Sequence, residues 1–297
     1  MIKKVIYLII SILITYISFQ FFTTNNETID RIFVINLDRS NERYSLMNSK
    51  LKSLNLGIKH ERISAVDGRE VEFINLNTQE ALTGADILDN QIILKGYYKI
   101  ICSKEEPGDE IFVRLDWSKF HMRGVGEMGH TCSSRKTWKK IIDKEYKNTL
   151  ILEDDLIFSN DFSSYLKRNM GFAPKDYDLL YLNLWDHWSS YTYKRKIDNS
   201  FLRFSLNIYD QYIRNLYWKK VRRNIVSAKS YIVTQAAAKK LLEYTQRMPD
   251  NILVTDVSIS FFIEDEKLIA YNSKLRLVDN NEDLKSDVDA LFKKKNN

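Results

Sequence analysis

The chain has 297 residues, of which 44% are apolar, and it contains only nine glycines and three prolines. This is enough chain for one large α/β domain or two smaller domains, and the composition excludes collagen-like and linker-dominated proteins. The formal net charge is +6, but the segment from His187 to Val226 alone carries +7. The rest is close to neutral, which disfavours a nucleic-acid-binding protein with basic charge spread over its surface.

The N-terminus begins with an apolar segment, Val5 to Phe22, which has 18 residues and no charge. That length is just sufficient to cross a hydrocarbon core. Two lysines precede the segment and acidic residues follow it, which predicts a cytoplasmic N-terminus. We therefore expect residues 1–22 to be a signal anchor in a single-pass protein of the secretory pathway or cell envelope. A cleaved signal peptide is the alternative, although no small-residue cleavage site follows.

A polar stem at residues 23–30 precedes the first predicted strand, Ile32 to Leu37, which is a nearly unbroken apolar run. Such a run is typical of a strand that is buried on both faces of a parallel sheet. A helix is predicted to begin after a cap at Ser40 and to end at Gly57, and His60 to Val66 reads as the next strand. This β-α-β unit predicts a parallel sheet.

The later elements continue the alternation of strands and helices, which predicts one α/β domain over residues 31–297 with a mostly parallel central sheet. Residues 70–128 show no regular pattern and are left open as an insertion beside a substrate cleft. The predicted elements are a helix at Ser134–Asn148, a strand at Thr149–Phe158, a strand at Asp178–Trp185, a strand at Ser227–Thr234 and a helix at Gln235–Arg247.

The two cysteines, Cys102 and Cys132, do not form a C-x-x-C pair, which argues against a cysteine zinc site. In an oxidising compartment they could form one disulfide. Two free, buried thiols are the alternative, and the sequence leaves both open.

Three carboxylates, Glu153, Asp154 and Asp155, directly follow the apolar run Leu150 to Leu152. Ligands of open parallel sheets bind beyond the carboxyl ends of the strands. Carboxylates that are crowded there repel one another, and a hard divalent cation such as Mn²⁺ or Mg²⁺ lowers that cost. The run therefore predicts a metal that bridges the protein to a diphosphate. A solvated acidic turn is the alternative.

Four sequence blocks, in this order, resemble glycosyltransferase family 25, the lipooligosaccharide and procollagen galactosyltransferase-like family. Each block alone is weak, but the order and spacing are specific and extend over nearly the whole chain after the apolar segment. The blocks are INLDRSNER at Ile35–Arg43, RISAVDGRE at Arg62–Glu70, GEMGHTCSSRKTWKKII at Gly126–Ile142 running into LILEDD, and SYIVTQAAAKKLLE at Ser230–Glu243 followed by Asp256.

The resemblance implies a GT-A-like fold in which acids of the D-x-D type hold Mn²⁺ against the diphosphate of a nucleotide-sugar donor. Glu153, Asp154 and Asp155 match that element, with Asp155 as the chief ligand. The implied nucleotide-facing residues are Asn36, Leu37, Arg43, Ala65, Val66, Asp67, Gly68 and Ser133. Arg43 could pair with a phosphate. The alternatives are a surface arginine at Arg43 and a simple turn at Asp67-Gly68.

The third block departs from the family pattern Gly-Cys-x-x-Ser-His, because the chain has GHTCSS from Gly129 to Ser134. Ser134 stands where the family has histidine, and His130 stands where it has cysteine. His130 could substitute for the missing histidine from its nearby position, or it could be structural.

The implied reaction is an inverting transfer of a hexose, such as galactose or glucose, from a UDP-sugar to a hydroxyl of a glycan, glycolipid or glycoprotein. A metal would neutralise the leaving diphosphate, and a carboxylate would accept the hydroxyl proton. Asp256 is the candidate base and Glu127 the second choice. Asp256 could instead cap a helix. The Ser134 departure keeps open an inactive relative that acts in binding or adhesion, and a different metal-dependent enzyme that acts on phosphate esters is a third hypothesis.

The basic segment His187 to Trp218 also contains nine aromatic residues. Aromatic faces can stack on sugars, and the lysines and arginines could hold an anionic acceptor. An amphipathic helix on the flank of the domain, or a patch on anionic lipid, is the alternative.

Overall fold

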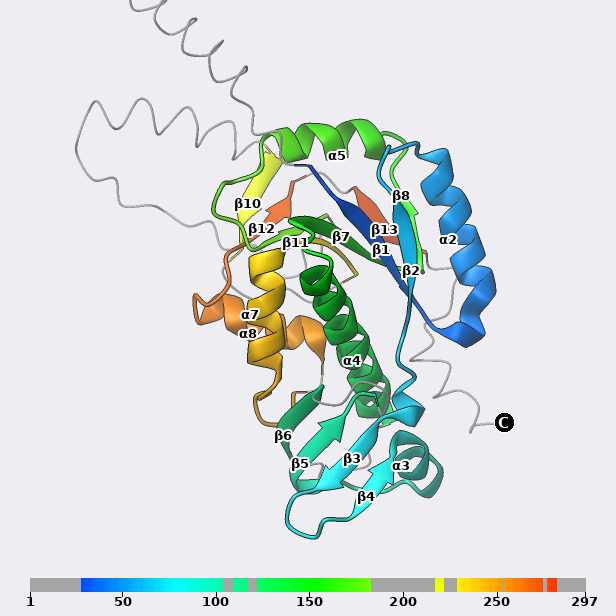
Figure 1. The fold of residues 1–297 in the computed structure, drawn as a ribbon, viewed down its shortest axis with the longest axis vertical. Helices are drawn as coiled ribbons and strands as arrows, with labels where there is room; N and C mark the ends of the chain where they lie inside the picture. The colour runs from blue at the N-terminus through cyan, green and yellow to red at the C-terminus, as the bar shows by residue number, and fades with distance from the viewer. Residues whose placement is uncertain are drawn as a thin grey trace, which may run out of the picture.

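A seven-stranded sheet forms the centre of the protein (Figure 1). The computed structural model describes residues 28–103, 109–116, 122–182, 217–221, 229–252, 254–274 and 277–281. The strand order is β10 (Trp218–Lys220), β12 (Ala270–Ser273), β9 (Leu179–Tyr181), β11 (Ser230–Thr234), β7 (Asn148–Glu153), β1 (Arg31–Asn36) and β2 (His60–Ser64). Five strands run in one direction, and only β10 and β11 oppose them. The predicted α/β class with a mostly parallel sheet is confirmed.

Helices cover both faces of this sheet, as alternating side chains of β1 show. Ile32 and Val34 pack with α2 (Asn41–Ser53) and α5 (Phe162–Gly171). Phe33 and Ile35 belong to the core of the opposite face. That face is covered by α4 (Met122–Asp143), α7 (Gln235–Thr245) and α8 (Thr255–Glu264). The apolar run of β1 is thus buried on both faces, as the sequence predicts.

The predicted β-α-β unit is present, because β1 and β2 pair in parallel and α2 connects them. The predicted start is confirmed, because Ser40 is the N-cap residue and α2 begins at Asn41, although the Ser40 side chain makes no capping hydrogen bond. A short 3-10 helix, η1 (Asp38–Ser40), leads into α2. The predicted end at Gly57 is wrong. The helix ends at Ser53, and Gly57, with a φ of 70°, lies in the following turn.

The predicted strand Thr149 to Phe158 is two strands. β7 ends at Glu153, a turn follows at Asp154 and Asp155, and β8 (Leu156–Phe158) then pairs with β13 (Val278–Asn280). The chain turns where the adjacent carboxylates begin. The acids therefore occupy a strand end and a turn.

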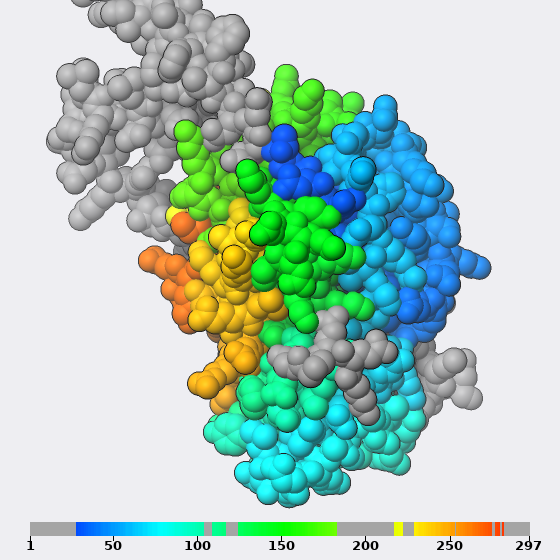
Figure 2. Space-filling view, in the orientation of Figure 1, coloured from blue at the N-terminus to red at the C-terminus, as the bar shows by residue number. Residues whose placement is uncertain are grey.

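Residues 70–128, which the sequence left unassigned, contain a second sheet. Its order is β4 (Ala81–Thr83), β3 (Glu72–Asn75), β5 (Lys95–Ile101) and β6 (Glu110–Asp116), all antiparallel. The helix α3 (Gly84–Asn90) and the 3-10 helix η2 (Gly68–Glu70) pack beside it. Figure 2 shows this region as the cyan lobe at the bottom of the view.

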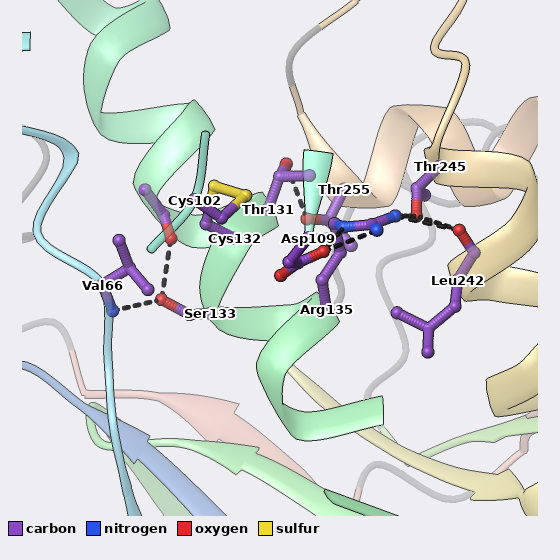
Figure 3. Close-up of a disulfide and its surroundings, with 11 residues drawn as sticks. Val66, Cys102, Asp109, Thr131, Cys132, Ser133, Arg135, Leu242, Thr245 and Thr255 are labelled. Carbon is purple, nitrogen blue, oxygen red and sulfur yellow. Dashed lines mark hydrogen bonds and ion pairs between the residues drawn. A yellow bond between two sulfur atoms is a disulfide. The ribbon is translucent and has the colours of Figure 1, made fainter. Parts of the chain in front are cut away.

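The helix α4 joins the two sheets, and it begins twelve residues before the predicted start at Ser134. Its Cys132 forms a disulfide with Cys102 beside β5, so the open question about these thiols is answered (Figure 3). Its Arg135 is buried, with an ion pair to Asp109 at 2.6 Å and a hydrogen bond to Thr245 Oγ1 of α7 at 2.7 Å. These contacts fix the smaller sheet to the layer of α4 and α7.

Three predictions lie wholly or largely outside the described residues. They are the anchor at 1–22, most of the basic aromatic segment, and the end of the predicted strand Asp178–Trp185 beyond Leu182. Within the described ranges, no helix has the length and apolar character needed to cross a membrane.

Candidate functional site

The polar residues of the site lie at one edge of the central sheet. The carboxyl ends of β1, β2 and β7 meet there, because these strands are parallel and adjacent. The amino end of β11 reaches the same edge, because β11 runs against β7. Asn36, Glu153 and Lys229 therefore come together from positions far apart in the sequence. The predicted placement of the acids at a strand end is confirmed for Glu153, the last residue of β7.

Strand alternation separates the first two acids. Leu152 packs on the face covered by α2, whereas Ile151 packs on the face covered by α4. Since side chains alternate along a strand, Glu153 follows Ile151 to the α4 face and Asp154 turns toward α2. Their hydrogen-bond partners agree with this, because they are His130 of α4 and Arg43 of α2.

Asp154 is buried between two side chains from the first sequence block. Arg43 forms an ion pair with Asp154 Oδ1, and Asn36 Nδ2 donates to Asp154 Oδ2 at 2.5 Å. Arg43 Nη2 also lies 4.0 Å from Asp155 Oδ2. The Arg43 side chain is only 15% exposed, so the alternative of a surface arginine is wrong. Its predicted contact with a phosphate stays a prediction.

Asp155 and Glu153 share one lysine. Lys229 Nζ lies 2.8 Å from Asp155 Oδ2 and 3.6 Å from Glu153 Oε2. Burial of Asp155 and the charge of Glu153 raise the pKa of Asp155, although Lys229 and Arg43 oppose the rise. Burial disfavours the charged ammonium, but the charges of Glu153 and Asp155 outweigh it and raise the pKa of Lys229. Lys229 is thus held as a cation at this edge.

His130 of α4 contacts Glu153 from the other side, with Nε2 and Oε1 3.1 Å apart. Burial opposes charge on both groups, but their hydrogen bond and mutual attraction outweigh it. The pKa of His130 is therefore raised and that of Glu153 lowered. Protonated His130 and ionised Glu153 form an ion pair.

Asp256 lies in the first turn of α8, close to His130. The two helices are joined by a hydrogen bond of 2.9 Å between Thr131 and Thr255, the neighbours of these two residues (Figure 3). The cap residue of α8 is Val254 and not Asp256, although Asp256 Oδ1 accepts a hydrogen bond from Val257 N at 2.8 Å in the first turn. Burial raises the pKa of Asp256 while the nearby charge of His130 opposes the rise. A carboxylate with a raised pKa is a stronger base.

The other two candidates on α4 differ in depth. Glu127 is half-buried and precedes His130 by three residues, which places the two on adjoining parts of the helix surface. Ser134 is buried one turn further along the helix. Because α4 leads into the start of β7, its earlier residues lie nearer the carboxyl end of that strand. His130 is therefore closer to the acidic edge than the serine at the position of the family histidine.

The predicted nucleotide-facing residues divide into a polar group and a packing group. Asn36 is the centre of the first, because Arg62 Nε donates to its Oδ1 at 2.7 Å while its Nδ2 donates to Asp154 and to Ser40 O. Leu37 follows Asn36 at the sheet edge and is half-buried, and Ala65 N donates to Asn36 O at 3.0 Å. These residues surround the end of β1.

The packing group joins the Asp67 turn to α4. Ser133 is buried, accepts a hydrogen bond from Val66 N at 2.8 Å and donates to Gly129 O at 2.7 Å (Figure 3). Asp67 caps η2 through Arg69 N and pairs with Arg39. A Cβ on Gly68 would lie 2.2 Å from a backbone oxygen of α4. Ser133 and Gly68 therefore hold the chain against α4, and any nucleotide contact from this group stays a prediction.

The acids do not fit a divalent cation in this arrangement. Glu153 and Asp154 point to opposite faces, and the Lys229 ammonium lies beside both Glu153 and Asp155. Asp155 Oδ1 alone among their oxygens is buried without a hydrogen-bond partner in the described part of the chain. Mg²⁺ is typically held by one or two carboxylates together with waters and phosphate oxygens, and here the Lys229 ammonium already lies against the Asp155 and Glu153 oxygens that would bind it. Across the described ranges, no three His, Cys, Asp or Glu side chains are grouped to hold a metal.

The gathering of these blocks at one sheet edge agrees with a comparison against known families. Residues 29–259 match the model described as glycosyltransferase family 25 (LPS biosynthesis protein). The chain belongs to glycosyltransferase family 25. The family match covers all four sequence blocks and the acidic edge, so the predicted resemblance is confirmed.

Curated family 25 proteins match part of the chain. A glycosyltransferase 25 family member of Drosophila pseudoobscura pseudoobscura is 31% identical over 160 residues, which is 52% of this chain and 20% of the relative. Procollagen galactosyltransferase 2 of Homo sapiens is 30% identical over 156 residues, which is again 52% of this chain and 20% of the relative. The matched region thus spans about a fifth of the length of these relatives.

Two residues of this family 25 site were not predicted. Arg62 forms an ion pair with Asp38 at 2.8 Å and positions Asn36, and Lys229 bridges the acids. Arg62 lies inside a recognised block and could have been proposed from it. Lys229 lies just before the fourth block, and only the antiparallel direction of β11 brings it to the acids.

Proposed function

We propose that this family 25 chain transfers a hexose, such as galactose or glucose, from a UDP-sugar to a hydroxyl of a glycan, glycolipid or glycoprotein, with inversion at the anomeric carbon. The observation that carries the proposal is the position of Glu153, Asp155, His130 and Asp256 at one sheet edge of a family 25 domain. A galactose donor is favoured because one relative is named procollagen galactosyltransferase 2.

In the proposed step, the acceptor oxygen forms a bond to the anomeric carbon as the bond from that carbon to the UDP oxygen breaks. UDP leaves with the electron pair. The Asp256 carboxylate accepts the hydroxyl proton, and its raised pKa suits that role. Glu127 is the second candidate base. The step as written does not require the Mn²⁺ or Mg²⁺ that the resemblance implies, because basic side chains already pair with the acids.

The test is to screen UDP-galactose, UDP-glucose and UDP-N-acetyl sugars for UDP release by the full chain, with and without Mn²⁺. Asp256→Asn should lower the rate by roughly 10²- to 10⁴-fold while UDP affinity is unchanged. Asp265→Asn is the matched control, because Asp265 is an exposed residue at the other end of α8. Absence of UDP binding and of UDP release from every donor would reject the proposal.

An inactive relative that acts in binding or adhesion is the competing function. It is motivated by Ser134, which stands where the family has histidine. Ser134 is buried, however, and His130 contacts Glu153 closer to the acidic end of the sheet. These positions favour an active enzyme. UDP binding without release of UDP from any donor, in the presence of candidate acceptors, would support the inactive relative instead.

We also propose that residues 1–22 anchor the protein in a secretory-pathway or cell-envelope membrane, with the N-terminus in the cytoplasm. The support is the uncharged run Val5 to Phe22 and the lysines before it. Resistance of the full chain to alkaline extraction from membranes is expected. Release into the soluble fraction would contradict the anchor.

A further inference from the structure

Lys229 occupies the position between Glu153 and Asp155 that a divalent cation would need. Its Nζ is 2.8 Å from Asp155 Oδ2 and 3.6 Å from Glu153 Oε2. A cation bound to these carboxylates would take the same oxygens at roughly 2.0–2.2 Å. The ammonium and the cation therefore exclude each other, both by space and by charge. A divalent cation would have to displace a lysine that already neutralises the site.

The lysine is positioned by the sheet. Glu153 N donates to Lys229 O at 2.9 Å, which extends the ladder between β7 and β11 by one residue. Lys229 thus lies across from Glu153, and strand alternation places it on the same face as Tyr231, which packs beneath α4. The side chain is 27% exposed, so part of it faces the open edge. Its location follows from the strand pairing.

The three acids are each matched by a base from a different element. His130 of α4 faces Glu153, Arg43 of α2 faces Asp154, and Lys229 faces Asp155. The charge that the acids would offer a metal is therefore already balanced within the chain. An ammonium carries three N–H donors, and at most two of those on Lys229 are directed at Asp155 and Glu153. Within the described residues this leaves a further donor for a phosphate oxygen.

We propose that the Lys229 ammonium takes the place of the divalent cation, so that this chain binds the diphosphate of its nucleotide-sugar donor without Mn²⁺ or Mg²⁺. The inference rests on the proposed function, because it concerns the same donor. Lysine is a compact point charge that suits a phosphate group. As the bond to the sugar breaks, the ammonium stabilises the negative charge that stays on UDP. No proton leaves Lys229 in this step.

The first measurement is UDP affinity of the wild-type full chain in excess EDTA and in millimolar Mn²⁺, by titration calorimetry. We expect dissociation constants that agree within about twofold, since a hydrogen bond to a charged group is already supplied by the lysine. A wild-type chain that binds UDP in Mn²⁺ and loses it in EDTA would overturn the inference, while the proposed function would stand. Absence of UDP binding in both conditions would instead reject the proposed function.

The second measurement uses Lys229→Gln, which removes the charge and keeps much of the length. In EDTA its UDP affinity should fall roughly 10- to 100-fold, the value of one charged hydrogen bond. Mn²⁺ should restore part of that affinity, because Glu153 and Asp155 are then free to bind it. Manganese binding by electron paramagnetic resonance should be detectable in Lys229→Gln and weak in the wild type.

Two further variants serve as controls. Lys219→Gln removes an exposed lysine on β10, the outermost strand on the side of the sheet away from β1 and β2. It should change neither UDP nor Mn²⁺ binding. Lys229→Arg keeps the charge and should bind UDP in EDTA, which separates loss of charge from loss of folding. Equal Mn²⁺ binding by the wild type and Lys229→Gln would also overturn the inference, and the wild-type comparison does not depend on any variant folding.

Discussion

The ion pair of Arg43 and Asp154 gives a direct test of the site, because the chain contains an internal comparison. Arg43 and Asp154 have side-chain exposures of 15% and 8%, whereas the pair of Arg39 and Asp67 has 43% and 22%. Both arginines lie in the same segment, four residues apart. Arg43→Met leaves a buried carboxylate that has lost its ion pair and keeps the hydrogen bond from Asn36. Arg39→Met leaves a carboxylate that water can reach.

We expect Arg43→Met to lower the free energy of unfolding by about 2–4 kcal/mol, slightly below the range for breaking a fully buried pair. Arg39→Met should cost about 0–1 kcal/mol, as for surface pairs. Adding Asp154→Asn to Arg43→Met removes the buried charge that Arg43 balanced, so the double variant should recover roughly 1–3 kcal/mol relative to the sum of the single variants.

Urea denaturation of the full chain in detergent, followed by tryptophan fluorescence, measures these differences. The reasoning is refuted if Arg43→Met costs no more than Arg39→Met, or if the single effects simply add. UDP titration of the same variants tests the sequence prediction that Arg43 meets a phosphate. Unchanged UDP affinity in Arg43→Met would assign the arginine to the support of Asp154 alone.

Two further predictions concern packing and pH. Gly68→Ala should lower the free energy of unfolding by about 1–3 kcal/mol, because its Cβ would lie 2.2 Å from a backbone oxygen. Gly171→Ala is the control, because its Cβ would have nothing within 4 Å, and it should be neutral or slightly stabilising. Urea denaturation measures both. The raised pKa of His130 means that its stabilising charge is complete below the ordinary value of 6.5 and is lost as pH rises through the folded value. The lowered pKa of Glu153 adds stability that is present above 4.5 and is lost as pH falls through its folded value. The free energy of unfolding should therefore decline as pH rises above about 6.5, and His130→Gln should flatten that decline; an equal slope in both proteins would contradict the ion pair.

The central strands could be predicted because their apolar runs are local signals. Arg31–Asn36 and Asn148–Glu153 are buried on both faces, and a short apolar run that ends in polar residues indicates such a strand. The end of β7 at Glu153 was less visible, because the apolar residues Leu156 to Phe158 continue after the acids. Only the pairing of β8 with β13, more than a hundred residues away in the chain, separates the two strands.

The smaller sheet was missed although part of its pattern is local. In β6, buried and exposed side chains alternate from Glu110 to Asp116, which is typical of a strand with one covered face. In β5 the alternation is less regular and includes Gly96, with a φ of 125°. The two strands pair with each other in an antiparallel ladder. The pattern is readable once α4 is known to cover the inner face, and the sequence placed the start of that helix too late.

The side-chain partners within the site could not be predicted from the sequence. The acids, Asp256 and the first block could be named because family motifs carry them, but their partners depend on which face of the sheet each side chain meets. A run of three acids suggests one shared ligand, whereas strand alternation sends Glu153 toward His130 and Asp154 toward Arg43. The reversed direction of β11 then brings Lys229 to Asp155. The charge crowding that predicted a metal is relieved here by three bases from three elements. The divalent metal predicted from that crowding stays a prediction, and comparing UDP binding in EDTA and in Mn²⁺ decides between a metal and Lys229 at this edge.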